Sequence, residues 1–282
     1  MNAIEIKGLT KSYGTFTLDG IDLTLPSGYI MGLIGENGAG KSTLIKLIFS
    51  MLRRDSGSVT VLGKDTDTAL QRVKDEIGVV LDEVGIPVCL NARQVERIMK
   101  YTYTGWDSER YHYLLRLLSI DCKKPFKDYS RGMKMKLGLA VAMSHGAKLL
   151  ILDEATSGID PVDRDRILEL LYDFTRDEGH SVLISSHIVS DLEKLCDYIA
   201  FLHKGKLMLC EEKDVLLSKY GILRMSAEEF SHVPKSAVLY VKENPYCTEA
   251  LVLREKLTGS ENVLPVSIEE LFVFMVKEDG KL

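Results

Sequence analysis

Residues 35–43 read Gly-Glu-Asn-Gly-Ala-Gly-Lys-Ser-Thr and join the apolar run 29–34 to the helical pattern of 44–52. The spacing G-x-x-x-x-G-K-S predicts a phosphate-binding loop, because its glycines let successive backbone N–H groups face an anion at a helix N-terminus. A chance glycine-rich turn is the alternative, but the strand-like run before the loop and the helical run after it are the context that this motif needs. Lys41 is expected to reach the β- and γ-phosphates of a nucleotide, and Ser42 to ligate Mg²⁺. The candidate nucleotide-binding residues of the loop are Gly35, Glu36, Asn37, Gly38, Ala39, Gly40, Lys41, Ser42 and Thr43.

Composition narrows the class of protein. The chain has 282 residues and a net charge of −5, without a long basic tract, which argues against nucleic acid as the main partner. Its five cysteines are scattered without C-x-x-C spacing, so reduced thiols are expected rather than a zinc site. No apolar run is long enough for a transmembrane helix, and the N-terminus lacks the pattern of a secretory signal. We therefore expect a cytoplasmic protein.

Two pairs of carboxylates follow apolar runs that are typical of buried parallel strands. Asp153 and Glu154 come after the run 149–152, and Asp82 and Glu83 come after 77–81. Because ligands bind at the carboxyl ends of such strands, Asp153 is expected to hold Mg²⁺ through water and Glu154 to polarise the attacking water. An ordinary solvated turn remains the alternative for both pairs.

Three further positions are ambiguous on their own. His187 follows the apolar strand 181–185, where it is either a surface residue or a donor to a γ-phosphate. Tyr13 precedes a turn, where an aromatic ring either packs or stacks on a purine. Ser130 and Gly132 lie at the start of a helical pattern where backbone N–H groups are free, which by itself indicates only a capped helix.

The order of elements predicts an α/β core with additions. Residues 3–34 read as short strands with an antiparallel piece, and 84–145 read as a helical insertion. From residue 213 the alternation of strands and helices stops. We expect 1–212 to be the nucleotide-binding domain and 213–282 a small α+β accessory domain. In the latter, 219–221 read as a linker, 237–241 as a strand, and 248–257 and 268–277 as helices.

Taken together and in this order, residues 3–210 resemble the ATP-binding subunit of an ABC transporter. Tyr13 matches the aromatic residue that stacks on adenine, residues 35–43 the Walker A loop, and 149–154 the Walker B strand. Residues 157–160 match the D-loop, and His187 the switch histidine. Residues 130–133 align with the signature that caps ATP on the opposite subunit. The resemblance implies a P-loop NTPase core with an antiparallel β subdomain and an inserted helical subdomain, and it adds Tyr13, Ser130, Gly132 and Asp160 to the nucleotide-binding residues.

The chain departs from the family pattern at particular positions. Arg131 replaces the first glycine of the usual Leu-Ser-Gly-Gly-Gln signature, and Asp82 stands where the family has a glutamine. An aspartate there can still hold Mg²⁺ or water, so Asp82 stays a candidate for both a catalytic and a metal-binding role. Such variants, together with Trp106-Asp107, Gly132-Met133-Lys134 in the signature and Leu271-Phe272-Val273 in the accessory domain, are similar to the subunits of bacterial ABC-2 type exporters.

The resemblance implies an ATPase motor that uses ATP and Mg²⁺. Two copies, or one copy and a paralogue, are expected to hold two ATP molecules between them. Glu154, His187 and Asp82 are the candidate catalytic residues, and Ser42, Asp153 and Asp82 the candidate metal ligands. The chain is expected at the inner face of the membrane, held by a separate permease subunit. The alternatives are a soluble ABC-type ATPase acting on nucleic acid or ribosomes, and a small-molecule P-loop kinase, against which the signature, D-loop and His187 argue.

Overall fold

The computed structural model describes residues 1–69, 73–243, 247–257, 259 and 262–279. It divides into two compact units, Met1–Cys210 and Glu211–Leu282, which we describe separately. The assignment of 213–282 as an accessory domain remains a prediction about function. Within the described ranges, none of the helices is both long and apolar enough to cross a membrane.

The centre of the first unit is a six-stranded sheet in the order β10-β9-β3-β8-β7-β6. Parallel pairing joins β6 to β7, β7 to β8, β8 to β3 and β3 to β9, so these strands end at one edge. Every residue of β3, β7 and β8 is buried, which is why these strands read as continuous apolar runs. The strands are β3 (Ile30–Ile34), β6 (Ile77–Val80), β7 (Leu149–Asp153), β8 (Ser181–Ser185), β9 (Tyr198–His203) and β10 (Lys206–Glu212).

A second, four-stranded sheet has the order β2-β1-β4-β5 and is antiparallel throughout. Side chains of α1 (Lys41–Ile48), such as Leu44, share one hydrophobic core with Ile6 of this sheet and Ile151 of the parallel sheet. Burial on both sides therefore fixes the helix that follows the phosphate loop. The strands are β1 (Asn2–Tyr13), β2 (Phe16–Pro26), β4 (Ser56–Val61) and β5 (Lys64–Asp65).

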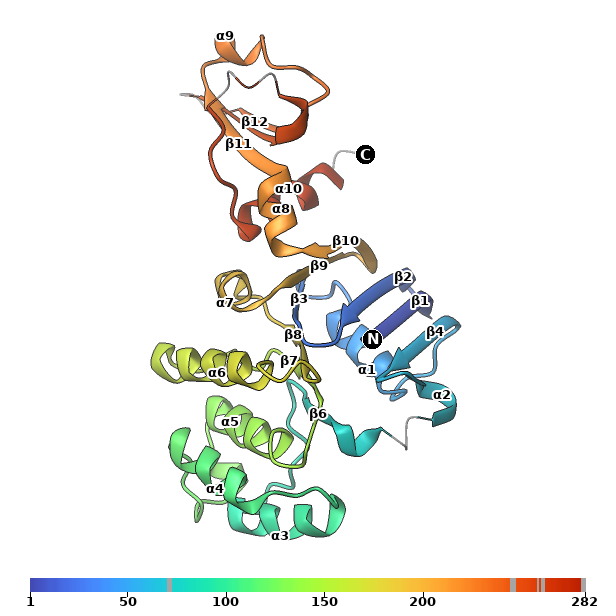
Figure 1. Cartoon of the computed structure of the whole chain (residues 1–282), viewed down its shortest axis with the longest axis vertical. Helices are drawn as coiled ribbons and strands as arrows, with labels where there is room; N and C mark the ends of the chain where they lie inside the picture. Colours follow the sequence, from blue (N-terminus) through green and yellow to red (C-terminus); the bar gives the residue numbers. More distant parts are fainter. Residues whose placement is uncertain (70–72, 244–246, 258, 260–261, 280–282) are drawn as a thin grey trace. The chain divides into compact units, whose positions relative to one another are not determined.

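Three helices gather beyond β6 and form the expected helical insertion (Figure 1). Asn91 and Gln94 form a capping box at the start of the first, Asp107 caps the second, and Ser130 caps the third. The helices are α3 (Ala92–Thr102), α4 (Ser108–Leu117) and α5 (Arg131–Ala142). The α/β class with an antiparallel sheet and a helical insertion is confirmed.

Shorter elements and two further helices complete the first unit. Helix α6 begins after Asp160 with Pro161 at its first position, where the missing N–H of proline costs no hydrogen bond. The described residues of this unit also form α2 (Thr66–Ala69), α6 (Pro161–Phe174) and α7 (Val189–Leu195), with 3₁₀ turns at Lys74–Glu76 and Phe126–Asp128.

The second unit contains a three-stranded antiparallel sheet in the order β11-β13-β12. Its strands are β11 (Tyr220–Met225), β12 (Val238–Glu243) and β13 (Thr248–Leu253). Its helices are α8 (Lys213–Lys219), α9 (Ala227–Phe230) and α10 (Ile268–Asp279), with a 3₁₀ turn at Arg254–Lys256.

Two expectations for this unit are wrong. Residues 219–221 are no linker, because α8 leads directly into β11, and a Cβ on Gly221 would lie 2.3 Å from Val263 Cγ1. The glycine therefore serves a close packing contact rather than a turn. Residues 248–257 are no helix either. Their first six form the central strand β13, which pairs on both sides, so tertiary pairing overrides the helix propensity of Glu, Ala and Leu.

Candidate functional site

The phosphate loop occupies residues 35–40, between β3 and α1. Gly40 has a φ of +109°, and a Cβ there would lie 2.8 Å from Phe16 Cζ. A Cβ on Gly35 would lie 2.5 Å from the carbonyl oxygen of Leu202. Gly40 is required because its backbone is left-handed, and both glycines are required because the chain there passes close to neighbouring strands. The loop is thus held on both sides by the rest of the unit.

Lys41 follows the loop as the first residue of α1 and is only 7% exposed. Its Nζ donates to the carbonyl oxygens of Gly35 at 2.7 Å and Glu36 at 3.3 Å. The same ammonium lies 3.8 Å from Oε1 of Glu154. Lys41 therefore joins the phosphate loop to the end of β7, which makes the loop and the carboxylate one site.

Asp153 is the last residue of β7 and is 2% exposed. Its neighbour in the parallel register is Ser185 of β8, whose hydroxyl donates to Asp153 Oδ1 at 2.5 Å. This hydrogen bond stabilises the ionised carboxylate and fixes its orientation. The backbone N–H of Glu154 also donates to Ser185 Oγ at 3.2 Å. Ser185 thus positions both carboxylate residues.

Glu154 has a φ of 55°, a left-handed conformation that is uncommon for a residue with a side chain. Such strain is found where surrounding structure holds a functional side chain in place. Its Oε2 accepts a hydrogen bond from His187 Nδ1 at 2.5 Å. With Nδ1–H given to the carboxylate, Nε2 of a neutral ring is an acceptor, so donation from Nε2 to a phosphate requires the protonated ring.

The residues present fit a magnesium ion. Asp153 supplies a buried carboxylate, and Ser42 supplies an exposed hydroxyl in the first turn of α1. Magnesium usually binds one or two protein oxygens together with water and substrate phosphates, so a dedicated protein cage is not needed. The described residues contain no cluster of three or more His, Cys, Asp or Glu side chains suited to a metal.

Asp82 follows β6 at the same edge of the sheet. Its carboxylate forms an ion pair with Arg131 at the start of α5. Both side chains are about half exposed, at 50% and 55%. Among the described residues, hydrogen bonds and ion pairs do not join Asp82 to Lys41, Asp153 or Glu154. Its metal-binding and catalytic roles remain predictions.

The predicted signature and D-loop lie against each other. Ser130 caps α5 by accepting from the N–H of Met133 at 3.2 Å. A Cβ on Gly132 would lie 2.9 Å from the carbonyl oxygen of Gly158, so only glycine allows this approach. Asp160 caps α6, and the N–H groups of Asp163 and Val162 hold the pKa of Asp160 below its usual value.

A nearly buried ion pair connects the two helices that follow these loops. Lys136 Nζ of α5 lies 2.7 Å from Asp163 Oδ2 of α6, with side-chain exposures of 9% and 14%. Signature and D-loop are therefore anchored to each other within one chain.

The ring of Tyr13, at the end of β1, is 41% exposed. Lys11 Nζ lies 5.3 Å from the centroid of this ring. Tyr13 is thus accessible to a ligand, but among the described residues no hydrogen bond, ion pair or ring contact joins it to the phosphate loop, and its stacking on adenine remains a prediction.

The sequence did not indicate the role of Ser185. It also did not indicate that Arg131 pairs with Asp82 or that Lys136 pairs with Asp163. Ser185 could have been found from the register of two neighbouring strand ends, since both strands end in the site. The two ion pairs join residues far apart in sequence, and no local spacing indicates them.

Comparisons with known proteins agree with this geometry. The family profile described as "ABC transporter" matches residues 18–157. The chain is 37% identical over 215 residues to the lantibiotic transport ATP-binding protein SrtF of Streptococcus pyogenes, covering 75% of this chain and 91% of that protein. It is 30% identical over 291 residues to the ABC transporter ATP-binding protein YtrB of Bacillus subtilis (strain 168), covering 99% of each.

A solved structure described as an ATP-binding subunit of an ABC transporter is also similar. It shares 25% identity, with a TM-score of 0.68, over 75% of this chain and 90% of its own. The similarity to YtrB extends through the second unit, whereas the solved structure and SrtF match about three quarters of the chain.

Proposed function

This chain belongs to the ATP-binding subunits of ABC transporters, enzymes that bind and hydrolyse ATP, and from that premise we propose that it drives export through a separate membrane subunit. One observation supports the motor function above all: Lys41 of the phosphate loop, Glu154 after β7 and His187 after β8 form a continuous chain of contacts. Transfer of a phosphoryl group to water needs a cation that binds the phosphates and a group that orients the attacking water, and both must lie at the same site.

Each residue has a role in this proposal. Lys41 leaves the carbonyl oxygens of its own loop to bind the β- and γ-phosphates, and loop N–H groups bind the same anion. Glu154 orients and polarises the attacking water, and the protonated ring of His187 donates to the γ-phosphate. Ser42 and Asp153 would hold Mg²⁺, which would supply positive charge next to the phosphate oxygens. Tyr13 stacks on the adenine.

The site is completed by a second ATP-binding subunit. In the proposal Ser130, Gly132 and Asp160 of one chain face the ATP held by the loop of the other. The fixed contact between the signature and the D-loop supports this, because Gly132 and Gly158 then move as one surface. The second subunit is another copy of this chain or a paralogue.

The membrane partner is a separate permease, and the chain is a peripheral protein on the cytoplasmic face of the membrane. We propose that the helical insertion, with Asp82 and the loop 84–90, transmits the ATP cycle to that permease. The relative SrtF, which is named for lantibiotic transport, supports an export role.

Affinity purification from detergent-solubilised membranes tests the proposal. Tagged chain should recover one integral membrane protein in a fixed ratio, and that complex should hydrolyse ATP. A chain that fractionates alone, or with ribosomes or nucleic acid, would contradict the export function.

A further inference from the structure

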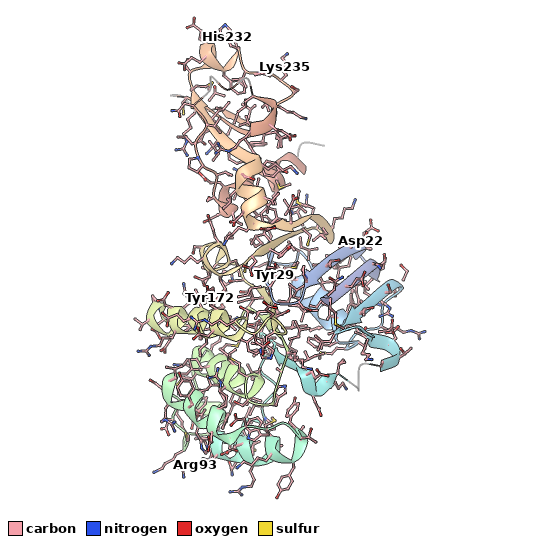
Figure 2. All side chains as sticks on the ribbon, viewed as in Figure 1. Asp22, Tyr29, Arg93, Tyr172, His232 and Lys235 are labelled. Atoms are coloured by element: carbon pink, nitrogen blue, oxygen red, sulfur yellow. The ribbon has the colours of Figure 1, made fainter. Side chains whose placement is uncertain are left out.

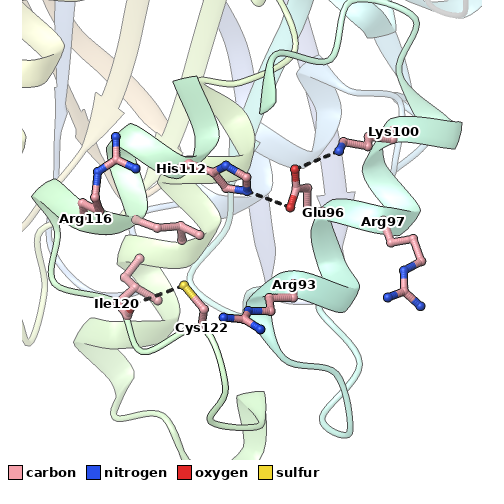
Figure 3. A pocket seen from close by; sticks show the side chains of 9 residues that line it. Arg93, Glu96, Arg97, Lys100, His112, Arg116, Ile120 and Cys122 are labelled. Atoms are coloured by element: carbon pink, nitrogen blue, oxygen red, sulfur yellow. Dashed lines mark hydrogen bonds and ion pairs between the residues drawn. The ribbon is translucent and has the colours of Figure 1, made fainter. Parts of the chain in front are cut away.

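A pocket of about 550 Å³ lies between α3 and α4, away from the phosphate loop. Most of its charged side chains are basic, since Arg93, Arg97, Lys100 and Arg116 contribute to its wall. His112 of α4 also lines the pocket, with its ring turned toward Glu96 of α3 (Figure 3). Figure 2 shows Arg93 at the surface of this end of the first unit. The ATP site described above uses none of these residues.

Among the described residues that line this pocket, the one acidic side chain is already paired with cations. Glu96 is 9% exposed, and its two carboxylate oxygens lie 3.1 Å from Lys100 Nζ and 2.9 Å from His112 Nε2. Burial opposes its ionisation, but hydrogen bonds from His112, Lys100 and Ser108 outweigh this and hold the pKa of Glu96 below its usual value. The negative charge of Glu96 is therefore already paired with Lys100 and His112, and it does not neutralise the arginines of the pocket.

Arg93, Arg97 and Arg116 are exposed, and within the part of the chain that the structure describes they form no ion pair. Three arginines that line one hollow thus have no carboxylate partner among the described residues, in a chain whose net charge is −5. Their planar forks match carboxylates, which they bind through two parallel hydrogen bonds. The charge of the pocket is complementary to an acidic ligand.

Apolar groups decide between a small anion and a protein segment. Leu115 and Ile120 contribute to the pocket lining, and Ile98 and Tyr101, one residue after Arg97 and Lys100, are 46% and 91% exposed on α3. A basic stripe and an apolar stripe therefore run side by side along one helix. An inorganic anion would contact the basic stripe and leave the apolar stripe exposed to water. A protein segment with carboxylates beside apolar side chains would cover both.

We propose that this basic pocket binds an acidic segment of the membrane subunit, through ion pairs of its Asp or Glu side chains with Arg93, Arg97 and Arg116. The inference rests on the proposed function, since it needs a membrane subunit, and it adds the chemistry by which that subunit is recognised. The pocket lies on the helical insertion, which the proposed function assigns to the permease.

Neutralising the pocket tests the proposal. The triple variant Arg93→Gln/Arg97→Gln/Arg116→Gln is compared with a control that removes three exposed cations elsewhere, Lys64→Gln/Lys74→Gln/Arg176→Gln. The pocket variant should recover the membrane subunit at least about tenfold less well than wild type, the loss expected when charge pairs at an interface are broken. The control should recover it normally. Both variants should keep the ATPase activity and melting temperature of the isolated chain, since none of these residues contacts the ATP site.

The outcomes separate the two proposals. If wild type recovers a membrane protein and the pocket variant recovers it equally, this inference is wrong and the proposed function stands. If wild type recovers none, the proposed function fails, and this inference with it.

Zero-length carbodiimide coupling of the purified wild-type complex identifies the occupant. Lys100 should become joined to an Asp or Glu of the membrane subunit. Coupling of Lys100 to Glu96 alone, with other lysines joined to the membrane subunit, would overturn the proposal. Binding of the isolated chain to phosphatidylglycerol vesicles that is lost in the pocket variant, without that cross-link, would assign the pocket to lipid headgroups instead. Competition by inorganic phosphate alone would assign it to a small anion.

Discussion

Asp82 and Arg131 form an ion pair with each other, although 48 residues separate them in the sequence. They are also the two positions at which the chain departs from the glutamine and the first signature glycine of the ABC pattern. The structure therefore relates two departures that look independent in the sequence. A carboxylate after β6 receives the guanidinium that the altered signature introduces at the start of α5.

This ion pair should contribute little to stability, because both side chains are half exposed and water screens their attraction. A double-mutant cycle with Asp82→Ala and Arg131→Ala should give a coupling energy below about 1 kcal/mol. Urea unfolding at low and high salt measures it, and salt should reduce it further. A coupling near 3 kcal/mol would show that the pair acts like a buried one.

Glu154→Gln should lower ATP turnover by about 10²–10⁴-fold, the range for loss of a general base. The glutamine keeps the size of the side chain but cannot take a proton, so ATP binding should persist and dimers should accumulate with ATP. Phosphate release and size-exclusion chromatography check this. Glu178→Gln, a change at an exposed glutamate, is the control and should behave as wild type. Near-normal turnover of Glu154→Gln would contradict the assigned role.

Lys41→Ala should weaken ATP binding by about 10–100-fold, since a hydrogen bond to a charged group contributes about 1.5–3 kcal/mol. Lys46→Ala removes an exposed cation from the same helix and should leave the affinity unchanged. Titration with a fluorescent ATP analogue compares them. Equal affinities in the two variants would argue against phosphate binding by Lys41.

Gly132→Ala should destabilise the protein by about 1–3 kcal/mol, although alanine favours helix formation. The reason is that its Cβ would lie 2.9 Å from the Gly158 carbonyl oxygen, and this backbone atom cannot move away easily. Gly138→Ala on the same helix meets the movable side chains of Val80 and Val84 at 3.3 Å and should cost less. Thermal unfolding ranks the two. The reverse order would mean that signature and D-loop are loosely packed.

Glu96 should make stability depend on pH in the acidic range. Since the pKa of Glu96 is lower in the folded protein than its ordinary value of 4.5, the unfolded chain binds the proton more readily. This contribution is present above about pH 4.5 and is lost as the pH falls through the lower folded-state pKa. Melting temperatures between about pH 5 and pH 3 should therefore fall less steeply in Glu96→Gln than in wild type. Glu109→Gln, at an exposed glutamate of α4, should keep the wild-type slope.

Contiguous motifs were predictable from the sequence. The phosphate loop needs glycines, Lys41 and Ser42 at fixed spacing, because neighbouring backbone groups form the site. The apolar run that ends in Asp153-Glu154 indicates a central strand for the same reason. The same reasoning failed in the second unit, where Gly221 looks like a turn residue and 248–253 have helix-forming composition. Pairing on both sides of β13 and the close contact of Gly221 with Val263 decided those segments.

The sequence by itself determined the ATP-binding family, and it predicts which loop and carboxylates form the site, since their spacing along the chain is part of the chemistry. Only the tertiary structure decided how those groups are held. Strand order and register bring the Ser185 hydroxyl to Asp153, and helix packing brings Arg131 to Asp82 and Lys136 to Asp163. These contacts join residues 27 to 49 positions apart. No local spacing encodes them, because they depend on which elements become neighbours when the apolar strands are buried.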